Sequence, residues 1–236
     1  MNSPHTPKNA RDRLIIALDF PDTPSALACV HALSGEVSFF KIGLQLYTAA
    51  GPEIVRAIAA TGAKIFLDLK LHDIPHTVGK AVAEVGKLGV AMVTLHLCGG
   101  RQMLETAVAS CPPDLLLLGV TVLTSSDETT LSETGITSGI AEQTLRLAEL
   151  GAAAGIRGVI ASPQEATRLR ERLGRDATII TPGVRPTWSP ADDQKRFTTP
   201  RQAIENGADF LVIGRPVTAH KDPRAAVRKI VEELAA

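Results

Sequence analysis

The sequence predicts an α/β protein folded as a (β/α)8 TIM barrel. Short apolar runs of β type occur eight times along the chain, and patterns rich in Ala, Leu and Glu separate them. The length of 236 residues is close to the ~250 residues typical of this barrel. A doubly wound open sheet also alternates strands and helices, but it usually has about five or six strands. The number of runs therefore favours the barrel.

Each predicted strand is a short run of Val, Ile, Leu or Phe bounded by Gly, Pro, Asp or Ser, which is typical of buried parallel strands. In chain order the runs are LIIALD (14–19), VSFFKIG (37–43), KIFLDLK (64–70), AMVTLH (91–96), DLLLLGVTV (114–122), RGVIAS (157–162), ATIITPG (177–183) and DFLVIG (209–214).

The segments between the runs have the spacing of amphipathic helices. Helices are predicted over residues 25–33, 52–60, 77–89, 140–155 and 223–236. No linker, low-complexity tract or change of composition divides the chain. We therefore expect a single barrel domain over residues 1–236, with residues 1–12 as a flexible N-terminal extension.

Two connections, residues 124–139 and 184–200, are longer than neighbouring elements require. They follow the fifth and seventh predicted strands. Long loops without regular structure are usually functional lids or disordered segments. Because active sites of this barrel are built from the loops that follow the strands, we expect both loops to border the site.

Composition excludes several classes of protein. Apolar residues make up 44% and charged residues 21% of the chain, as in ordinary globular proteins. Lys plus Arg and Asp plus Glu both number 25, so the basic excess of a nucleic-acid binder is missing. The apolar run 115–123 is far shorter than the ~20 residues that span a bilayer. An odd count of 3 cysteines without a CxxC pair indicates neither a disulfide framework nor a zinc site, so we expect a cytoplasmic protein.

Charged residues stand at the ends of the first three predicted strands. Asp19, Lys41, Asp68 and Lys70 each lie on the strand face that carries the apolar side chains Ile15, Phe39 and Phe66. On the barrel model these faces point inward, so the four charges converge at one end. Asp73 follows in the next loop and completes the pattern Asp68-x-Lys70-x-x-Asp73.

A simpler interpretation is that these are solvated charges at a rim. Buried charges are unfavourable unless they are paired, and two acids and two lysines can pair as a neutral group. Four charges in register on consecutive strands favour a preorganised catalytic cluster over four unrelated rim residues.

A phosphate site is predicted at the other end of the chain. Gly183-Val-Arg185 follows the seventh strand and Gly214-Arg215 follows the eighth. Glycine lets backbone N–H groups approach an anion, and arginine binds phosphate oxygens as a bidentate fork. Barrels often hold phosphate with the loops after these two strands. Two glycine turns with exposed arginines are the alternative.

The segment DLKLHDIPHT (68–77) resembles the signature of the orotidine 5′-phosphate decarboxylase family, which usually reads DLKFHDIPNT. Leu71 and His76 are the two departures, and neither belongs to the acid–lysine array. The resemblance continues in the family's order through ALDF (17–20), FFKIGLQLY (39–47), GVTVLTS (119–125), TPGVRP (181–186), DQKR (193–196) and IGRPVTA (213–219). It covers nearly the whole chain, which looks like the shorter bacterial, monofunctional type.

The resemblance implies that orotidine 5′-monophosphate loses CO₂ to give UMP, the last step of pyrimidine nucleotide synthesis, without a cofactor or a metal. It also implies a homodimer. Lys70 is then the proton donor in an array with Lys41, Asp68 and Asp73, and Asp73 comes from the partner subunit. The remaining residues that the resemblance implies for substrate binding are Asp19, Lys41 and Asp68 at the ribose and array, Thr77 from the partner, Thr124 by the base, and Arg185, Gln194, Gly214 and Arg215, chiefly at the phosphate.

Two rival functions remain open at this point. Mg²⁺-dependent sugar-phosphate decarboxylases and aldolases of the same barrel group share an Asp-x-Lys-x-x-Asp pattern, but they need an acid near the second strand, where this chain has Lys41. A non-catalytic nucleotide-binding protein on the same scaffold would keep the arginines and lose Lys70 or its carboxylates, all of which are present.

Overall fold

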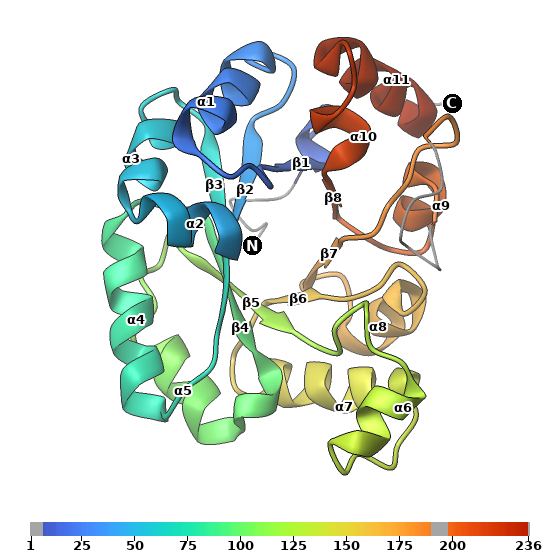
Figure 1. The fold of residues 1–236 in the computed structure, drawn as a ribbon. Helices are drawn as coiled ribbons and strands as arrows, with labels where there is room; N and C mark the ends of the chain where they lie inside the picture. The colour runs from blue at the N-terminus through green and yellow to red at the C-terminus, as the bar shows by residue number, and fades with distance from the viewer. Residues whose placement is uncertain (1–6, 190–197, 236) are drawn as a thin grey trace.

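The computed structural model describes residues 7–189 and 198–235, in which eight parallel strands close into a barrel in the order β1 to β8 (Figure 1). Each strand pairs in parallel with the next one in sequence, and β1 also pairs with β8. The predicted (β/α)8 barrel is therefore confirmed.

Every strand falls on its predicted run, and only β3 extends past the run, by Leu71. The strands are β1 (Leu14–Ala17), β2 (Phe39–Gly43), β3 (Lys64–Leu71), β4 (Met92–His96), β5 (Leu116–Val120), β6 (Gly158–Ile160), β7 (Thr178–Thr181) and β8 (Phe210–Ile213).

Helices connect the strands and form the outer layer of the barrel (Figure 1). The α-helices are α1 (Thr23–Ala32), α2 (Leu44–Ala50), α3 (Glu53–Ala59), α4 (Pro75–Lys87), α5 (Arg101–Ala109), α6 (Glu128–Glu133), α7 (Ile140–Ala153), α8 (Ala166–Leu173), α9 (Pro200–Glu205), α10 (Arg215–Thr218) and α11 (Pro223–Ala235). Two 3-10 helices, η1 (Arg11–Arg13) and η2 (Leu97–Gly99), precede β1 and follow β4.

The structure corrects one of the two predicted loops. Residues 124–139 are not free of regular structure, because α6 forms within them. The side chain of Asp127 accepts the backbone N–H of Thr130 at 2.9 Å and so caps the helix N-terminus. Residues 190–197 of the second loop lie outside the described residues. Its far end is fixed where Thr199 and Gln202 form a capping box at the start of α9.

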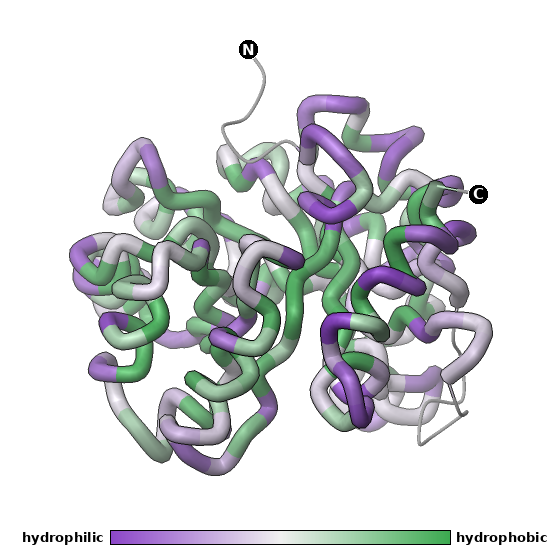
Figure 2. The backbone as a smooth tube through the Cα atoms, turned by 90° about the horizontal axis from the view of Figure 1, so that it is seen from above, coloured by the Kyte–Doolittle hydropathy of each residue, from purple (hydrophilic) through white to green (hydrophobic). Residues whose placement is uncertain are grey.

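Two apolar layers hold the barrel together. One fills the barrel interior and includes Ile15, Phe39, Phe66, Met92 and Phe210. The other lies between the strands and the surrounding helices, and the strand residues that alternate with the interior set belong to it. The strand segments at the centre of Figure 2 are accordingly hydrophobic, and hydrophilic residues gather on the outer turns. Both faces of each strand are buried, which explains the nearly continuous apolar runs.

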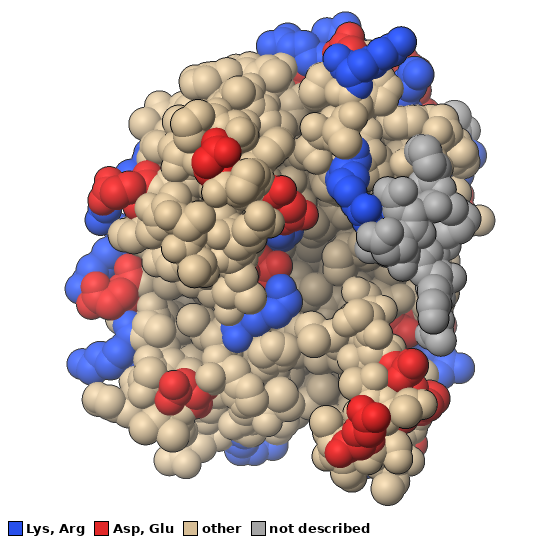
Figure 3. All heavy atoms as spheres, viewed as in Figure 1, with Lys and Arg blue, Asp and Glu red and all other residues tan. Residues whose placement is uncertain are grey.

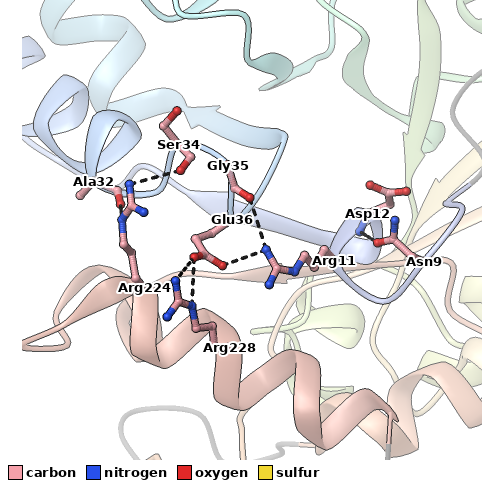
Figure 4. Close-up of polar contacts among 9 residues, drawn as sticks. All are labelled: Asn9, Arg11, Asp12, Ala32, Ser34, Gly35, Glu36, Arg224 and Arg228. Atoms are coloured by element: carbon pink, nitrogen blue, oxygen red, sulfur yellow. Dashed lines mark hydrogen bonds and ion pairs between the residues drawn. The ribbon is translucent and has the colours of Figure 1, made fainter.

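A buried carboxylate, Glu36, joins the first and last segments of the barrel at the N-terminal ends of the strands (Figure 4). Its side chain is 6% exposed and pairs with Arg11 of η1 at 2.9 Å. It also accepts hydrogen bonds from Nε and Nη2 of Arg228 in α11, at 3.0 and 2.6 Å. Arg224, on the same helix, donates to the carbonyls of Ala32 and Ser34. These contacts fix α11 and η1 to the loop before β2.

The predicted N-terminal extension, residues 1–12, stays a prediction. Residues 1–6 lie outside the described residues, whereas Arg11 is bound to Glu36 and donates to the carbonyl of Gly35 at 3.3 Å. Among the described helices, none combines the length and the apolar character that crossing a membrane requires.

Glu36→Gln tests the contacts of Glu36 with Arg11 and Arg228, since it removes the charge of the side chain and keeps its shape. The hydrogen bond from Arg228 lowers the pKa of Glu36, and the charges of Arg228 and Arg11 add to that effect. The carboxylate therefore stabilises the fold above the ordinary pKa of glutamate, and this contribution is lost as the pH falls through the lowered value. We expect the variant to melt roughly 2–6 °C below the wild type at pH 7. This gap in melting temperature should narrow as the pH falls.

Thermal unfolding followed by circular dichroism at several pH values measures this gap. Glu53→Gln is the control, because Glu53 forms an exposed pair with Arg56 that should contribute little. A gap between wild type and Glu36→Gln that stays constant into the acid range contradicts the assignment.

Candidate active site

A cavity of about 180 Å³ opens at the carboxyl ends of the strands, where Lys41, Asp68, Lys70 and Thr124 line it. Figure 3 shows a hollow in the middle of the barrel face with acidic and basic side chains at its margin. A larger hollow, of about 430 Å³, lies beside Arg11 and Glu36 at the opposite end, away from the strand-end charges. The predicted convergence of Lys41, Asp68 and Lys70 is therefore present in the smaller cavity.

Asp68 is the centre of the charged cluster. Nζ of Lys70 lies 2.9 Å from each of its carboxylate oxygens, and Nζ of Lys41 lies 3.9 Å from its Oδ2. The side chain of Asp68 is only 14% exposed. Because a carboxylate removed from water is unfavourable without partners, the contacts with both lysines offset part of its burial.

Lys41 links Asp68 to the end of β1. Its Nζ donates to Oδ1 of Asp19 at 3.2 Å, and its own side chain is 11% exposed. Gly43 leaves the space that this ammonium occupies, because a Cβ at that position would lie 2.9 Å from Nζ. The order Asp19, Lys41, Asp68, Lys70 therefore alternates charge across β1, β2 and β3, as the sequence predicted.

Thr94 is a site residue that sequence reasoning missed. Its hydroxyl donates to Oδ1 of Asp68 at 2.8 Å and accepts the backbone N–H of Lys70 at 2.9 Å. It is fully buried in β4. The available signal was a polar residue in the middle of the run AMVTLH, on the same strand face as the interior residue Met92.

The backbone of β3 turns at Lys70. Lys70 has a φ of +50°, the one positive value among non-glycine residues in the described ranges. The register between β3 and β4 shifts between Leu67 and Leu71, which is the geometry of a bulge that redirects a side chain. Residues in this left-handed conformation persist where surrounding contacts hold them, and Thr94 supplies one such contact.

Asp73 and Thr77 are not among the residues that line the cavity. Both are exposed. Asp73 accepts the backbone N–H of Ile74 at 2.7 Å, and Thr77 lies in the first turn of α4. Ile74 between them is 67% exposed, although it is a large apolar residue. Within one chain, the described contacts do not bring Asp73 or Thr77 into the Lys41–Asp68–Lys70 cluster.

The predicted phosphate residues follow β7 and β8. Arg185 is buried, with 6% exposure, and Arg215 begins α10 and is exposed. A Cβ on Gly214 would lie 3.5 Å from Oδ2 of Asp19, so the end of β8 adjoins the charged cluster. Gln194, the remaining predicted residue of this group, lies outside the described residues.

Apolar side chains form the rest of the cavity wall. They are Phe66, Val120, Val122, Leu123, Ile160, Ala161, Pro182 and Val212. Such a wall excludes water, and charges act more strongly where water is excluded. The cavity therefore combines an apolar surface with an ammonium group that is held in place.

His96, at the end of β4, lies near His72. Its ring centroid is 5.7 Å from that of His72. Burial lowers the pKa of His96, and the neighbouring charges of His72 and Lys70 lower it further. The protonated form of His96 is therefore disfavoured at this position.

The residues in the described ranges include no group of three or more His, Cys, Asp and Glu side chains arranged to hold a metal ion. The cavity instead presents two ammonium groups held by carboxylates. Such an arrangement can stabilise negative charge that develops on a bound molecule, because the donors are already oriented before the charge forms.

Comparison with known proteins gives consistent matches over nearly the whole chain. The model of the family described as "Orotidine 5'-phosphate decarboxylase / HUMPS family" matches residues 12–230. Curated proteins named orotidine 5'-phosphate decarboxylase are similar to this chain. The one from Syntrophotalea carbinolica is 48% identical over 96% of each chain. The one from Opitutus terrae is 49% identical over 94% of this chain and 97% of its own.

A solved structure is similar as well. The crystal structure of orotidine 5'-phosphate decarboxylase from Lactobacillus acidophilus has a TM-score of 0.83 and 37% identity, and the match covers 94% of this chain and 99% of that one. The fold of that protein is therefore similar to the fold of this chain.

Thr94→Val tests whether this hydroxyl positions the cluster. The variant keeps the β-branched shape but removes the donor to Asp68 and the acceptor for the Lys70 N–H. We expect turnover to fall by roughly 10- to 100-fold, since small misplacements of catalytic groups have effects of this size, while the protein stays folded. Steady-state kinetics measures the turnover, and circular dichroism shows whether the protein is folded.

Thr181→Val is the matched control for that variant. Thr181 is also fully buried in a strand, and its hydroxyl has no hydrogen-bond partner in the described residues. We expect the turnover of this control to be close to that of the wild type. Equal effects of the two substitutions would contradict a positioning role for Thr94.

Proposed function

Because the chain belongs to the orotidine 5'-phosphate decarboxylase / HUMPS family, we propose that it converts orotidine 5′-monophosphate to UMP and CO₂, the last step of UMP synthesis. The observation that carries the proposal is the ammonium group of Lys70, held 2.9 Å from both oxygens of Asp68 at the mouth of a cavity with an apolar wall.

The chemistry requires a positive charge beside carbon 6 of the pyrimidine. When the bond from C6 to the carboxylate breaks, CO₂ leaves and the electron pair stays on C6, where no adjacent carbonyl can delocalise it. The Lys70 ammonium stabilises this pair electrostatically and then transfers a proton to C6, which gives UMP. The neutral amine regains its proton from water. Preorganised charge stabilisation of this kind is usually the largest catalytic contribution.

Lys41, Asp68 and Asp19 hold the substrate around this centre. Asp68 orients Lys70 and Lys41, and Lys41 with Asp19 binds the ribose hydroxyls. Thr124, on the cavity lining, lies by the base. The apolar wall packs against the ring, and it keeps water from the carbanion.

The phosphate binds on the side of β7 and β8, with Arg185, Gln194, Gly214 and Arg215. Paired arginines supply the bidentate donors that phosphate oxygens accept. The phosphate is remote from the bond that breaks, yet its binding energy lowers the barrier if that energy is used to order the site around the base.

The complete site takes residues from two subunits of a homodimer. Asp73 and Thr77 are exposed beside Ile74, which is itself exposed, so a second copy of the chain can reach them. In the dimer, Asp73 of each subunit joins the Lys41–Asp68–Lys70 cluster of the other, and Thr77 contacts the ribose there.

The decarboxylase needs no cofactor and no metal, because Lys70 supplies both the positive charge and the proton. The rival function, a Mg²⁺-dependent sugar-phosphate decarboxylase or aldolase, requires an acid near the end of β2. That position holds Lys41, whose ammonium is bound to Asp19 and Asp68 and repels a cation.

A chain with this activity and without a disulfide framework works in the cytoplasm.

Lys70→Ala tests the function directly. The variant should retain its fold and lose at least ~10³-fold in turnover, because it lacks both the charge and the proton donor. The assay follows the loss of orotidylate absorbance, with EDTA present throughout. Wild-type turnover in EDTA supports the decarboxylase over the Mg²⁺-dependent rival. Near-normal turnover by Lys70→Ala would remove the central role of this lysine.

Mixing two inactive variants tests the shared site. In a heterodimer of Lys70→Ala and Asp73→Ala chains, one site carries both substitutions and the other carries neither. After subunit exchange of an equal mixture, about a quarter of wild-type activity should return, as expected for two-fold symmetric sites. Mass spectrometry of the intact dimer verifies the exchange. No recovery despite proven exchange would contradict the assignment of Asp73 to the partner.

A further inference from the structure

The proposed phosphate site has two arginines on two separate loops. Arg185 follows β7 and Arg215 follows β8, so their relative position depends on how the two loops are fixed to each other. A bidentate grip on phosphate requires donors in a fixed geometry. Trp188, the single tryptophan of the chain, lies where these loops meet.

Trp188 packs edge-on against His220. Their ring centroids are 5.7 Å apart with an interplanar angle of 79°, which is a favourable T-shaped geometry. On α11, Nζ of Lys229 lies 5.5 Å from the centroid of the Trp188 ring, within range of a cation–π interaction. The preceding residue, Thr187, donates its backbone N–H to Oε2 of Glu233 on the same helix at 3.4 Å.

The segment between Arg185 and Trp188 is short and well fixed. Arg185 donates its backbone N–H to the carbonyl of Thr198 at 3.0 Å, and Ser189 donates to the carbonyl of Pro186 at 3.0 Å and closes a turn. Pro186 restricts the backbone within this turn. A displacement of Trp188 is therefore transmitted to Arg185 through three peptide units.

The ring of His220 is held close in sequence to the other arginine, Arg215. His220 follows α10, which begins at Arg215. The backbone N–H of Asp222 lies 3.0 Å from Nδ1 of His220, so a local turn orients the imidazole. The contact of Trp188 with His220 thus connects the segment of Arg185 to the segment of Arg215.

We propose that Trp188 is a positioning residue that braces the loop after β7 against the loop after β8, so that Arg185 and Arg215 bind the substrate's phosphate as one unit. This inference rests on the proposed function, in which both arginines contact the phosphate. Trp188 itself touches neither the base nor the reacting carbon.

The ring of Trp188, rather than its N–H, makes the contact that braces the two loops. Nε1 of Trp188 is buried and has no hydrogen-bond partner in the described residues. Removing a donor that makes no hydrogen bond is close to neutral. Phenylalanine should therefore replace Trp188 with little effect, whereas alanine removes the ring contact with His220.

The experiment compares kcat/KM for orotidine 5′-monophosphate with kcat/KM for orotidine, which lacks the phosphate. For Trp188→Ala, we expect a loss of roughly 10- to 100-fold on the phosphorylated substrate, as for other misplaced binding groups, and little change on orotidine. Trp188→Phe should restore kcat/KM for both substrates to near the wild-type value. His220→Ala removes the other half of the contact and should show the same selective loss, which keeps the test valid if Trp188→Ala folds poorly.

Arg170→Ala is the control for a general loss of stability. Arg170 binds Asp209 at 2.6 Å and the carbonyls of Gly207 and Ala177, at the opposite end of β7 and β8. This variant should melt at a lower temperature without any selective loss on the phosphorylated substrate.

The outcomes separate the brace from the function itself. Equal losses on both substrates, a loss that Phe does not restore, or no loss in either Ala variant would overturn the brace while leaving the decarboxylase in place. Wild-type protein that fails to consume orotidine 5′-monophosphate would overturn the proposed function, and the brace with it.

Discussion

The partly buried carboxylate of Asp68 is the constraint on which the site depends. Its side chain, 14% exposed, receives Lys70 on both oxygens, the hydroxyl of Thr94 on one, and Lys41 at a longer distance. A charge in such a place is stable only with partners, and these partners come from β2, β3 and β4. The strands must therefore end in register for the carboxylate to be satisfied. The left-handed backbone of Lys70 and the shift between β3 and β4 are parts of the same arrangement.

The two ends of the barrel carry different kinds of ionic contact. At the N-terminal ends of the strands, Glu36 binds arginines from η1 and α11 and joins the first and last segments of the fold. At the carboxyl ends, the charges of Asp19, Lys41, Asp68 and Lys70 border an open cavity. Between them lies an apolar interior of side chains such as Phe39, Phe66 and Phe210. The half of the barrel at the N-terminal ends of the strands thus supports the charged groups at the carboxyl ends. These groups are oriented before any substrate binds, which is the condition for electrostatic catalysis.

In the proposed function, the two halves of the substrate meet different parts of this end of the barrel. The base and ribose are assigned to the cluster at the ends of β1 to β3, and the phosphate is assigned to the loops after β7 and β8. Closure of the barrel brings these parts together, because β1 pairs with β8 and Gly214 adjoins Asp19. Binding energy gained at the phosphate acts at the base only if the connecting loops are firmly held. Trp188 and His220 provide that connection between the two arginine segments.

Sequence alone determined the fold class, because buried parallel strands need apolar side chains on both faces and the helices between them need one apolar face. It also determined that Asp19, Lys41, Asp68 and Lys70 share an inward face, since side chains alternate along a strand. Tertiary structure alone decided the role of Thr94, the positive φ of Lys70 and the contact of Trp188 with His220. Each of these depends on how neighbouring segments meet in space. The helix α6 was missed because its capping by Asp127 is local, while the pattern around it is too short and polar to predict a helix. Periodicity reports which face of a segment is buried, and only the assembled barrel shows which atoms that face meets.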